Sequence, residues 1–334
     1  MIEVRTYARL HLGLLDNNGE QGRLYGSIGV AVNGPHLVLR AEKADGLQVE
    51  GPEAERITTY ARRFFKHFGL PEKARLNLLS AIPAHVGLGS GTQIALAVGT
   101  ALARLAGLRL STPEVAVAVG RGMHSGIGIG TFQHGGFVLD GGHRVQANPL
   151  HPPEVSGQAR RTEKNSVPPV LFQRPMPKDW FFVTAIPETG QGLSGKKEDN
   201  AFLQLPQAPA ALVEKISWVL LMKMLPALVE KDIANFGRAL TGIQYMVGDC
   251  FASVQGGRFA GAVSEKMVDF LLQRGAAGIG QSSWGPTVYG LVEGRTKARQ
   301  LAKEAEAYLA ELGGGKVYCV QPQNRGVQVR EYPV

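Results

Sequence analysis

Residues 83–93 read Pro83-Ala84-His85-Val86-Gly87-Leu88-Gly89-Ser90-Gly91-Thr92-Gln93. The alternating residues 75–82 before this segment predict a strand, and the Ala- and Leu-rich residues 92–105 predict a helix that begins at its end. Glycines let backbone N–H groups converge, and the first turn of a helix offers amides and a partial positive charge to an anion. The pattern predicts a phosphate site. A tight turn that needs glycine only for its backbone angles is the alternative that the loop alone leaves open.

Two common phosphate loops do not fit this segment. It lacks the Gly-Lys-Ser/Thr ending of a P-loop. Its Gly-x-Gly spacing also lacks the third glycine and the later acidic residue of a dinucleotide fingerprint.

Length and composition predict a folded, two-lobed protein. The chain has 334 residues, of which 44% are hydrophobic and 19% charged, which is enough to bury a large core. Seven prolines and little periodicity mark residues 149–177 as a connection. We therefore expect an N-terminal lobe over residues 1–150, a Pro-rich connection over 151–179 and a C-terminal α+β lobe over 180–334.

Charge and cysteine content limit the class of partner. The formal charge of +8 favours anionic partners, but no polybasic run or aromatic-basic RNA motif is present, so small polyanions are favoured over nucleic acid. Two cysteines, the lack of a signal peptide and the lack of a long apolar run predict a cytoplasmic protein with no membrane contact.

Periodicity predicts the remaining elements. Further strands are expected at residues 2–14, 27–32, 36–42, 137–139, 180–186, 287–292 and 316–321. Further helices are expected at residues 53–68, 111–120, 211–225, 231–246, 261–273 and 296–312. Residues 122–136 and 275–285 are expected to form two more glycine-rich loops.

The pattern Pro-x-x-x-Gly-Leu-Gly-Ser resembles the phosphate loop of the GHMP kinases, the group that contains galactokinase, homoserine kinase and mevalonate kinase. Those kinases continue with a magnesium-binding Ser and an Ala, where this chain has Gly91 and Thr92. Their later segment Ser-Gly-x-Asp, followed after six residues by Gly-Gly, corresponds here to Ser125-Gly126-Ile127-Gly128 and Gly135-Gly136. The resemblance implies an α+β, GHMP-kinase-like two-lobe fold, with a ribosomal-S5-like N-terminal lobe and a ferredoxin-like C-terminal lobe.

Gly128 stands where the kinases have their catalytic carboxylate. Phosphoryl transfer to a hydroxyl needs a group that orients and deprotonates the acceptor, so this glycine argues against kinase activity. Three segments resemble a non-kinase branch, the β-ribofuranosylaminobenzene 5′-phosphate synthases of tetrahydromethanopterin biosynthesis. They are Arg9-Leu10-His11 with Gly22-Arg23-x-x-Gly26-x-Ile28-Gly29, then residues 87–93, and lastly Gly280-Gln281-Ser282-Ser283-Trp284-Gly285-Pro286.

This second resemblance implies a reaction. Such an enzyme transfers the phosphoribosyl group of phosphoribosyl pyrophosphate (PRPP) to 4-aminobenzoate or 4-hydroxybenzoate, and forms a C-riboside, CO2 and pyrophosphate. It implies Mg²⁺ as cofactor with no need for ATP, and small molecules as the partners. GHMP relatives are often dimers, so a homodimer is expected by analogy.

The expected site residues follow from the same segments. For PRPP and its phosphates they are Arg9, Gly87, Leu88, Gly89, Ser90, Gly91, Thr92, Gln93, Lys196 and Lys197, with Ser90 and Thr92 as candidate metal ligands. His11, Arg23, His124 and Gln281 are the expected catalytic residues, and Ser282, Ser283 and Trp284 the expected pocket for the aromatic acceptor. Surface charges, structural histidines and a core tryptophan are the alternative roles for these residue types.

Two other functions fit the same sequence. One is an ATP-dependent GHMP kinase of small molecules that uses a different base. The other is a non-catalytic protein that binds a phosphorylated metabolite, because loss of the carboxylate at Gly128 is also how an inactive relative would look.

Overall fold

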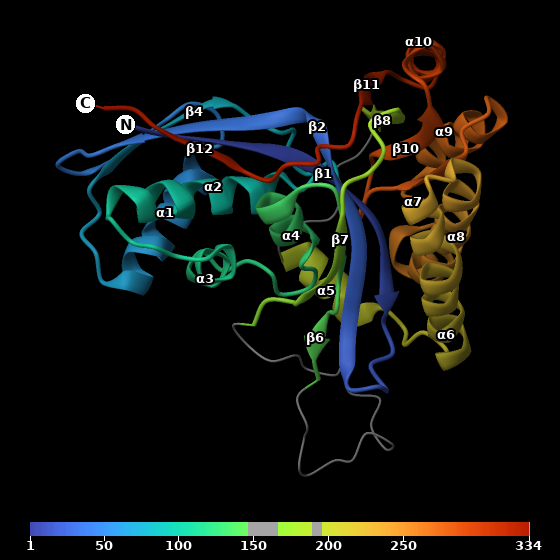
Figure 1. Cartoon of the computed structure of the whole chain (residues 1–334), viewed down its shortest axis with the longest axis horizontal. Coiled ribbons are helices and arrows are strands. Elements are labelled where there is room, and N and C mark those ends of the chain that lie inside the picture. Colours follow the sequence, from blue (N-terminus) through green and yellow to red (C-terminus); the bar gives the residue numbers. More distant parts are fainter. Residues whose placement is uncertain (146–165, 189–195, 334) are drawn as a thin grey trace.

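Two β-sheets and the helices around them form the structure, a computed structural model that describes residues 1–145, 166–188 and 196–333 (Figure 1). For residues 196–199 it describes the backbone only. In the first sheet the strands run in the order β12-β1-β2-β4-β3, while β5 and β6 pair with β2, and β7 pairs with β5. These strands are β1 (Ile2–Asp16), β2 (Arg23–Glu42), β3 (Leu47–Glu50), β4 (Ala74–Ser80), β5 (Phe137–Asp140), β6 (His143–Arg144), β7 (Val170–Arg174) and β12 (Gln328–Glu331).

One expected break in this sheet is absent. The sequence predicts two short strands at residues 27–32 and 36–42, and the structure has the single long strand β2. The ladder between β1 and β2 shifts its register between Tyr7 and Arg9, so the Asn-Gly-Pro segment at residues 33–35, between the two expected strands, forms an irregularity within one strand.

Three helices lie against the first sheet, α1 (Ala54–Phe68), α2 (Ser90–Leu105) and α4 (Ile127–His134), and α3 (Thr112–Ala118) packs on these helices. The start of α3 is the expected one, because the side chains of Ser111 and Glu114 form a complete capping box. Helix α4 lies where a glycine-rich loop was expected. A Cβ on Gly130 would lie 2.7 Å from Cγ1 of Val138, so this glycine serves close packing of α4 on β5 rather than a turn.

The second sheet has the antiparallel order β11-β8-β10-β9. Its strands are β8 (Trp180–Pro187), β9 (Gly278–Gln281), β10 (Val288–Glu293) and β11 (Gly315–Val320). Its main helices are α8 (Ile233–Gln255), α9 (Ala262–Gln273) and α10 (Arg295–Glu311). This order, with helices after the first and third strands, is the ferredoxin-like arrangement. The expected α+β fold with two sheets and a ferredoxin-like C-terminal part is confirmed.

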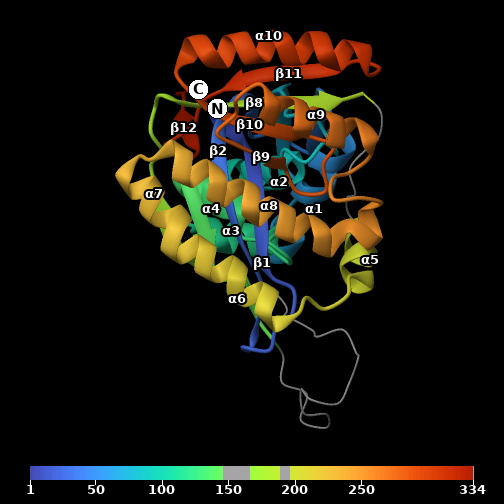
Figure 2. The same cartoon turned by 90° about the vertical axis from the view of Figure 1, so that its right-hand side faces the viewer.

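A run of helices precedes α8. It consists of α5 (Lys196–Gln204), α6 (Ala210–Val219), the π-helical turn η1 (Leu220–Met224) and α7 (Leu225–Glu230). Figure 2 shows α6, α7 and α8 as an outer layer in front of β1. None of the helices in the described ranges has both the length and the apolar character needed to cross a bilayer.

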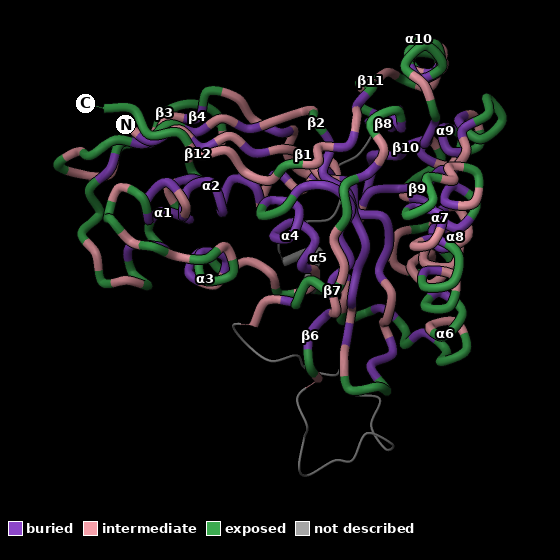
Figure 3. Tube along the Cα trace, in the orientation of Figure 1, coloured by how far each residue is buried: buried purple, intermediate pink, exposed green. Residues whose placement is uncertain are grey.

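One hydrophobic core crosses the junction between the lobes. Phe236 and Ile243 of α8 belong to the same buried cluster as Trp180 of β8 and Leu10 of β1. Buried residues accordingly continue from α2 through β1 and β2 to the second sheet (Figure 3). A second cluster, which includes Val183, Met267 and Leu301, fills the opposite face of the second sheet under α9 and α10.

Two strand pairings cross the expected boundaries between the lobes. Strand β7 falls within the expected connection, yet it pairs with β5, and β12 leaves the expected second lobe to pair with β1. Residues 151–165 of the expected connection lie outside the described residues.

Candidate active site

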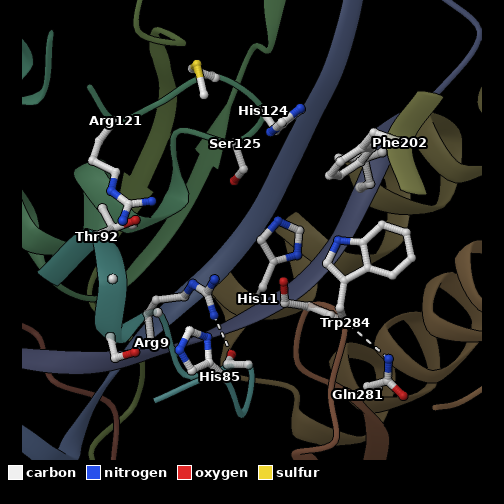
Figure 4. Close-up of a pocket in the computed structure, with 18 of the residues that line it drawn as sticks. Arg9, His11, His85, Thr92, Arg121, His124, Ser125, Phe202, Gln281 and Trp284 are labelled. Carbon is white, nitrogen blue, oxygen red and sulfur yellow. Dashed lines mark hydrogen bonds between the residues drawn. The ribbon is translucent and has the colours of Figure 1, made fainter. Parts of the chain in front are cut away.

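A cavity of about 570 Å³ lies where the two lobes meet. Its walls come from the glycine loop before α2, from β1, from the segments around α3 and α4, from α8 and from the loop after β9. In Figure 4, Arg9, Thr92 and Arg121 lie on one side, Phe202 and Trp284 on the other, and His11 and Ser125 between them.

The glycine loop is held in place by its carbonyl groups. The Val86 carbonyl accepts a hydrogen bond from the Thr287 amide (3.2 Å), that of Gly87 from the Ser282 hydroxyl (2.7 Å), and that of Leu88 from the Arg9 amide (3.1 Å). A Cβ on Gly87 would lie 2.3 Å from the Ser282 carbonyl oxygen, so only glycine fits there. The loop is thus fixed to β1 and to the second lobe, and the first turn of α2 borders the cavity. The Thr92 and Gln93 amides donate to the Gly89 carbonyl (3.1 Å each), which leaves the two amides before them, of Ser90 and Gly91, for an anion.

Three arginines surround this turn, and a fourth, Arg63, lines the cavity beside Gly120. Arg9 comes from β1, Arg56 and Arg63 from α1, and Arg121 from the loop after α3. A Cβ on Gly91 would lie 2.6 Å from Nη2 of Arg56 and 2.9 Å from Nη2 of Arg121. Guanidinium groups therefore occupy the space where a side chain at position 91 would project. Together with the helix N-terminus they form an anion subsite.

The arginines are oriented by neighbours on α1 and beside it. Arg121 donates a hydrogen bond from Nη2 to the Tyr60 hydroxyl, and its Cζ lies 5.0 Å from the centre of the Tyr60 ring. Arg56 forms an ion pair of 2.8 Å with Glu53. Arg63 donates to the Val119 carbonyl at 3.4 Å. No aspartate or glutamate is among the cavity-lining residues of the described chain, so this subsite is strongly cationic.

Aromatic rings form the opposite wall. The ring of Trp284 lies 4.8 Å from Phe251 and 5.3 Å from Phe202, and His124 stacks on Phe202 with 4.4 Å between the ring centres. Tyr25 contacts both His124 and Phe202 edge to face. This wall suits a planar aromatic ligand.

His11 lies between the two walls and is uncharged at neutral pH. Burial disfavours the protonated ring and Arg9 repels it, which together lower the pKa of His11 to about 3. Its side chain is therefore a neutral hydrogen-bonding group. It does not supply a proton near neutral pH.

Thr92 fills the space beside Gly128. A Cβ on Gly128 would lie 2.8 Å from Cγ2 of Thr92. The Gln93 side chain fixes Gly128 by donating a hydrogen bond to the Gly128 carbonyl at 2.9 Å. A carboxylate side chain at position 128 would need Thr92 to move.

The lining does not fit a magnesium ion held by the protein. Mg²⁺ in proteins is bound through one or two carboxylates together with substrate phosphates. Ser90 and Thr92 offer hydroxyl groups at most, and no described residue of the lining is acidic. The described residues also contain no group of three or more His, Cys, Asp or Glu side chains placed to hold a metal.

Many of the expected site residues come together in this cavity. The lining includes Arg9, His11, Gly87, Gly89, Ser90, Gly91, Thr92, His124, Gln281, Ser283 and Trp284. Gln281 also has a structural task, because its side chain accepts from the Ala260 amide at 2.6 Å and donates to the Ser283 carbonyl at 2.9 Å.

Arg23 requires a correction. It does not line the cavity, because its guanidinium donates to the carbonyls of Gly141 (2.6 Å) and Gly142 (2.7 Å) and so fixes the turn after β5.

Three other expected site residues lie behind the cavity wall. Leu88 is a buried core residue, and Gln93 supports Gly128. The Ser282 hydroxyl is held between the His11 amide (2.9 Å) and the Gly87 carbonyl. The side chains of Lys196 and Lys197 lie outside what is described, although Phe202 of the same helix α5 lines the cavity.

Several lining residues were not expected from the sequence. They include Arg56, Tyr60, Arg63, Arg121, Ser125, Phe202, Gln244, Phe251 and Arg258. A signal was present on α1, where Arg56, Tyr60 and Arg63 share one helical face by their spacing, but a basic helical face is normally exposed to solvent. Phe202 and Phe251 follow no motif, and only the fold brings them to Trp284.

Comparison with known proteins identifies relatives of this chain. Family models of the GHMP kinases match it twice, the N-terminal domain over residues 55–136 and the C-terminal domain over residues 224–311. A β-ribofuranosylphenol 5′-phosphate synthase of Methanothermobacter thermautotrophicus is 36% identical over 333 residues, which cover 97% of each chain. That of Archaeoglobus fulgidus is 36% identical over 332 residues, which cover 98% of this chain and 99% of the relative.

Solved structures share the fold at low sequence identity. A homoserine kinase from Cytophaga hutchinsonii has a TM-score of 0.66 at 16% identity, with 98% of this chain and 97% of that chain covered. The mevalonate kinase of L. major, in complex with R-mevalonate, has a TM-score of 0.65 at 14% identity, with 96% of each chain covered.

Proposed function

Because this chain belongs to the β-ribofuranosylphenol 5′-phosphate synthase family within the GHMP kinase superfamily, we propose that it is a decarboxylating phosphoribosyltransferase. It transfers the phosphoribosyl group of PRPP to 4-hydroxybenzoate or 4-aminobenzoate. The products are a C-riboside, CO2 and pyrophosphate, and the pathway is the biosynthesis of tetrahydromethanopterin. The nearness of a cationic subsite and an aromatic wall in one cavity is the observation that carries the proposal.

The cationic subsite suits the leaving group. Negative charge grows on pyrophosphate as C1 of the ribose becomes oxocarbenium-like, and preorganised donors stabilise such charge most effectively. The Arg9, Arg56 and Arg121 guanidiniums and the first amides of α2 are donors of this kind. Arg63 extends the same positive region toward Gly120, where its guanidinium suits the 5′-phosphate of PRPP.

The aromatic wall suits the acceptor. An electron-donating group opposite the carboxylate enriches the ring carbon that bears the carboxylate, and this carbon attacks C1 of the ribose. Loss of CO2 then returns the electron pair to the ring. Trp284, Phe202 and Phe251 hold the ring in this step and exclude water from the oxocarbenium-like carbon. No covalent enzyme intermediate is needed.

The two departures from the kinase pattern support this reaction over phosphoryl transfer. Gly91, which replaces the kinases' magnesium-binding Ser, lies against two guanidinium groups, and Gly128, which replaces their Asp, lies against Thr92. Cationic side chains thus stand where the kinases have a metal ligand. The expected Mg²⁺ enters this proposal only as an ion that PRPP carries into the cavity, and no step depends on a protein-held ion.

A homodimer in the cytoplasm is part of the same proposal. Four exposed apolar side chains on the α6–α7 run support it, namely Trp218, Leu221, Met222 and Val229. Sedimentation of the wild type and of Trp218→Lys checks the dimer, and the variant is expected to be monomeric.

The decisive experiment follows the carboxyl carbon. Carboxyl-labelled 4-hydroxybenzoate or 4-aminobenzoate, incubated with PRPP, Mg²⁺ and the protein, is expected to release labelled CO2 in equal amount to pyrophosphate. An ATP-dependent kinase would instead consume ATP with a hydroxylated metabolite such as homoserine, without release of label. A binding protein would bind PRPP and turn over neither acceptor, and either result would overturn the proposal.

A further inference from the structure

A buried carboxylate lies just behind the cavity. Asp140, the last residue of β5, is fully buried and does not line the cavity. Its carboxylate accepts hydrogen bonds from the Ser27 hydroxyl (2.5 Å), the Gly126 amide (2.9 Å) and the Gly142 amide (2.9 Å). A buried carboxylate is costly unless it is well hydrogen-bonded, and the donors to this one come from three segments of the chain.

Two serine hydroxyls connect this carboxylate to the cavity. The Ser27 hydroxyl lies 2.7 Å from that of Ser125, which lines the cavity. Ser27 has one proton, which it donates to Asp140, so Ser125 donates its own proton to Ser27. Ser125 in turn accepts from the Ile127 amide at 3.2 Å. The Ser125 proton is directed to Ser27, away from the cavity. The Ser125 oxygen, which faces the cavity (Figure 4), can therefore only accept a hydrogen bond there.

The direction of this chain selects the ligand group. An acceptor oxygen binds an O–H or N–H donor of a ligand, and a chain of hydroxyls that ends on a carboxylate also offers a route for the donor's proton. Burial raises the pKa of Asp140 to about 6, although hydrogen bonds from the Ser27 side chain and from the Gly142, Gly126 and Ser27 backbone oppose this rise. The carboxylate is therefore a better proton acceptor than an exposed aspartate. The described lining itself contains no carboxylate, so Asp140 reaches the cavity only through the two serines.

We propose that Ser125, Ser27 and Asp140 form a proton relay that takes the para-hydroxyl proton of the acceptor and later returns it. This inference rests on the proposed function. It supplies the base that Gly128 does not carry, from β5 instead of α4. Ser125 is the catalytic residue that touches the substrate, and Ser27 and Asp140 are positioning residues that act through it.

The proton and electron balance closes. The para O–H bond breaks and its proton passes to Ser125, while the Ser125 proton passes to Ser27 and the Ser27 proton to Asp140. The released electron pair strengthens attack of the carboxylate-bearing carbon on C1 of the ribose, and the C1–O bond breaks with its electrons leaving on pyrophosphate. The bond to the carboxylate then breaks, CO2 departs, and the ring recovers as a phenolate. Asp140 returns the proton by the reverse route.

The relay distinguishes the two acceptors. A phenolic hydroxyl gains much donor strength when it loses its proton, whereas a neutral amino group already donates its lone pair and does not need to lose a proton. Removal of the relay should therefore impair the reaction of 4-hydroxybenzoate far more than that of 4-aminobenzoate. A role of Asp140 limited to fixing the Gly126 and Gly142 turns would affect both acceptors alike.

The test compares both acceptors in two variants. Ser27→Ala breaks the relay at a fully buried residue that does not line the cavity. Ser125→Ala removes the hydroxyl group through which the relay meets the substrate. In each variant kcat/KM for 4-hydroxybenzoate should fall about 100-fold, the ordinary size of a general-base contribution, through kcat more than KM. For 4-aminobenzoate Ser27→Ala should leave kcat/KM near the wild-type value.

Two further variants serve as controls. Ser125→Thr keeps a hydroxyl at the cavity and should restore the activity with 4-hydroxybenzoate. Thr184→Val removes a buried hydroxyl of β8, which is absent from the lining, and should change neither acceptor. Melting temperatures of all variants check that each is folded.

Three results would overturn the relay. The first is an equal loss of activity with both acceptors, which indicates a structural role or a contact to ribose hydroxyls. The second is no loss of activity with 4-hydroxybenzoate. The third is failure of Ser125→Thr to restore activity. A wild-type protein that releases CO2 from neither acceptor would instead refute the proposed function itself.

Discussion

Gly91 is the residue at which this site departs most clearly from a metal-binding phosphate loop, because two guanidinium groups take up the space of its missing side chain. Arginine binds phosphate through paired N–H donors whose geometry a displaced guanidinium loses. Position 91 therefore controls the affinity for PRPP through Arg56 and Arg121, although a glycine itself contacts the ligand only with its backbone.

Gly91→Ala is expected to raise KM for PRPP at least about 10-fold, since a charged hydrogen bond contributes about 1.5–3 kcal/mol. Gly242→Ala on α8 is the matched control, because nothing lies within 4 Å of a Cβ built there. It should leave KM unchanged and stabilise the helix by about 0.5–1 kcal/mol. Steady-state kinetics and thermal unfolding measure the two effects, and equal KM values for both variants would contradict the assignment of the anion subsite.

His11 makes the stability of the protein depend on pH. Its folded-state pKa of about 3 lies below the ordinary value of 6.5, so between these values the unfolded chain binds a proton that the folded protein does not. Stability from this residue is complete above pH 6.5 and is lost as the pH falls toward 3. His11→Asn should reduce the loss of unfolding free energy between about pH 7 and pH 5 by about 2 kcal/mol. Denaturant titrations at the two pH values check this, and an unchanged loss would refute it.

Among the elements, helix α1 shows how a local pattern can mislead. Its basic face predicts exposure, but the fold turns Arg56 toward the cavity and uses Tyr60 to orient Arg121. Helix α2 was predictable together with its loop, because the glycines, the strand before them and the apolar run after them all agree. Helix α4 was not, since its glycines serve close packing, which depends on partners far away in the sequence.

Tyr60→Phe tests the supporting role of α1. The ring remains under Arg121, but the hydroxyl that accepts from its Nη2 is lost. KM for PRPP is expected to rise about five-fold with kcat unchanged, as fits the loss of one hydrogen bond of about 1 kcal/mol. Tyr308→Phe, in a ring stacked on Phe270 outside the cavity lining, should behave as wild type. A fall in kcat without a change in KM would contradict this role.

At the scale of the whole molecule, the shared core joins the two lobes into one cooperative unit. Trp180, Phe236 and Leu10 belong to one buried cluster although they come from different lobes, and β12 returns to the first sheet. We expect a single unfolding transition, with a calorimetric enthalpy equal to the van't Hoff enthalpy. Differential scanning calorimetry measures both, and two resolved transitions would show that the lobes unfold separately.

The sequence predicts which residues line the cavity better than it predicts where their side chains lie. Arg9, His11, the glycine loop and Trp284 were recognisable because each belongs to a motif, and all of them line the cavity. Arg23 belongs to a motif too, yet its guanidinium donates hydrogen bonds to two backbone carbonyls away from the cavity. Motif membership does not reveal which side of a strand a side chain takes, nor that α8 brings Phe251 to the cavity.

The methyl group of Thr92 beside Gly128 has an evolutionary consequence. An ancestor or descendant with phosphotransfer activity would need an acidic residue at position 128, and that residue collides with threonine at 92. Reversion in one mutational step therefore yields a protein impaired in both chemistries. Only a paired replacement at positions 92 and 128 makes room for an acidic side chain, so neither position can return to the kinase pattern alone.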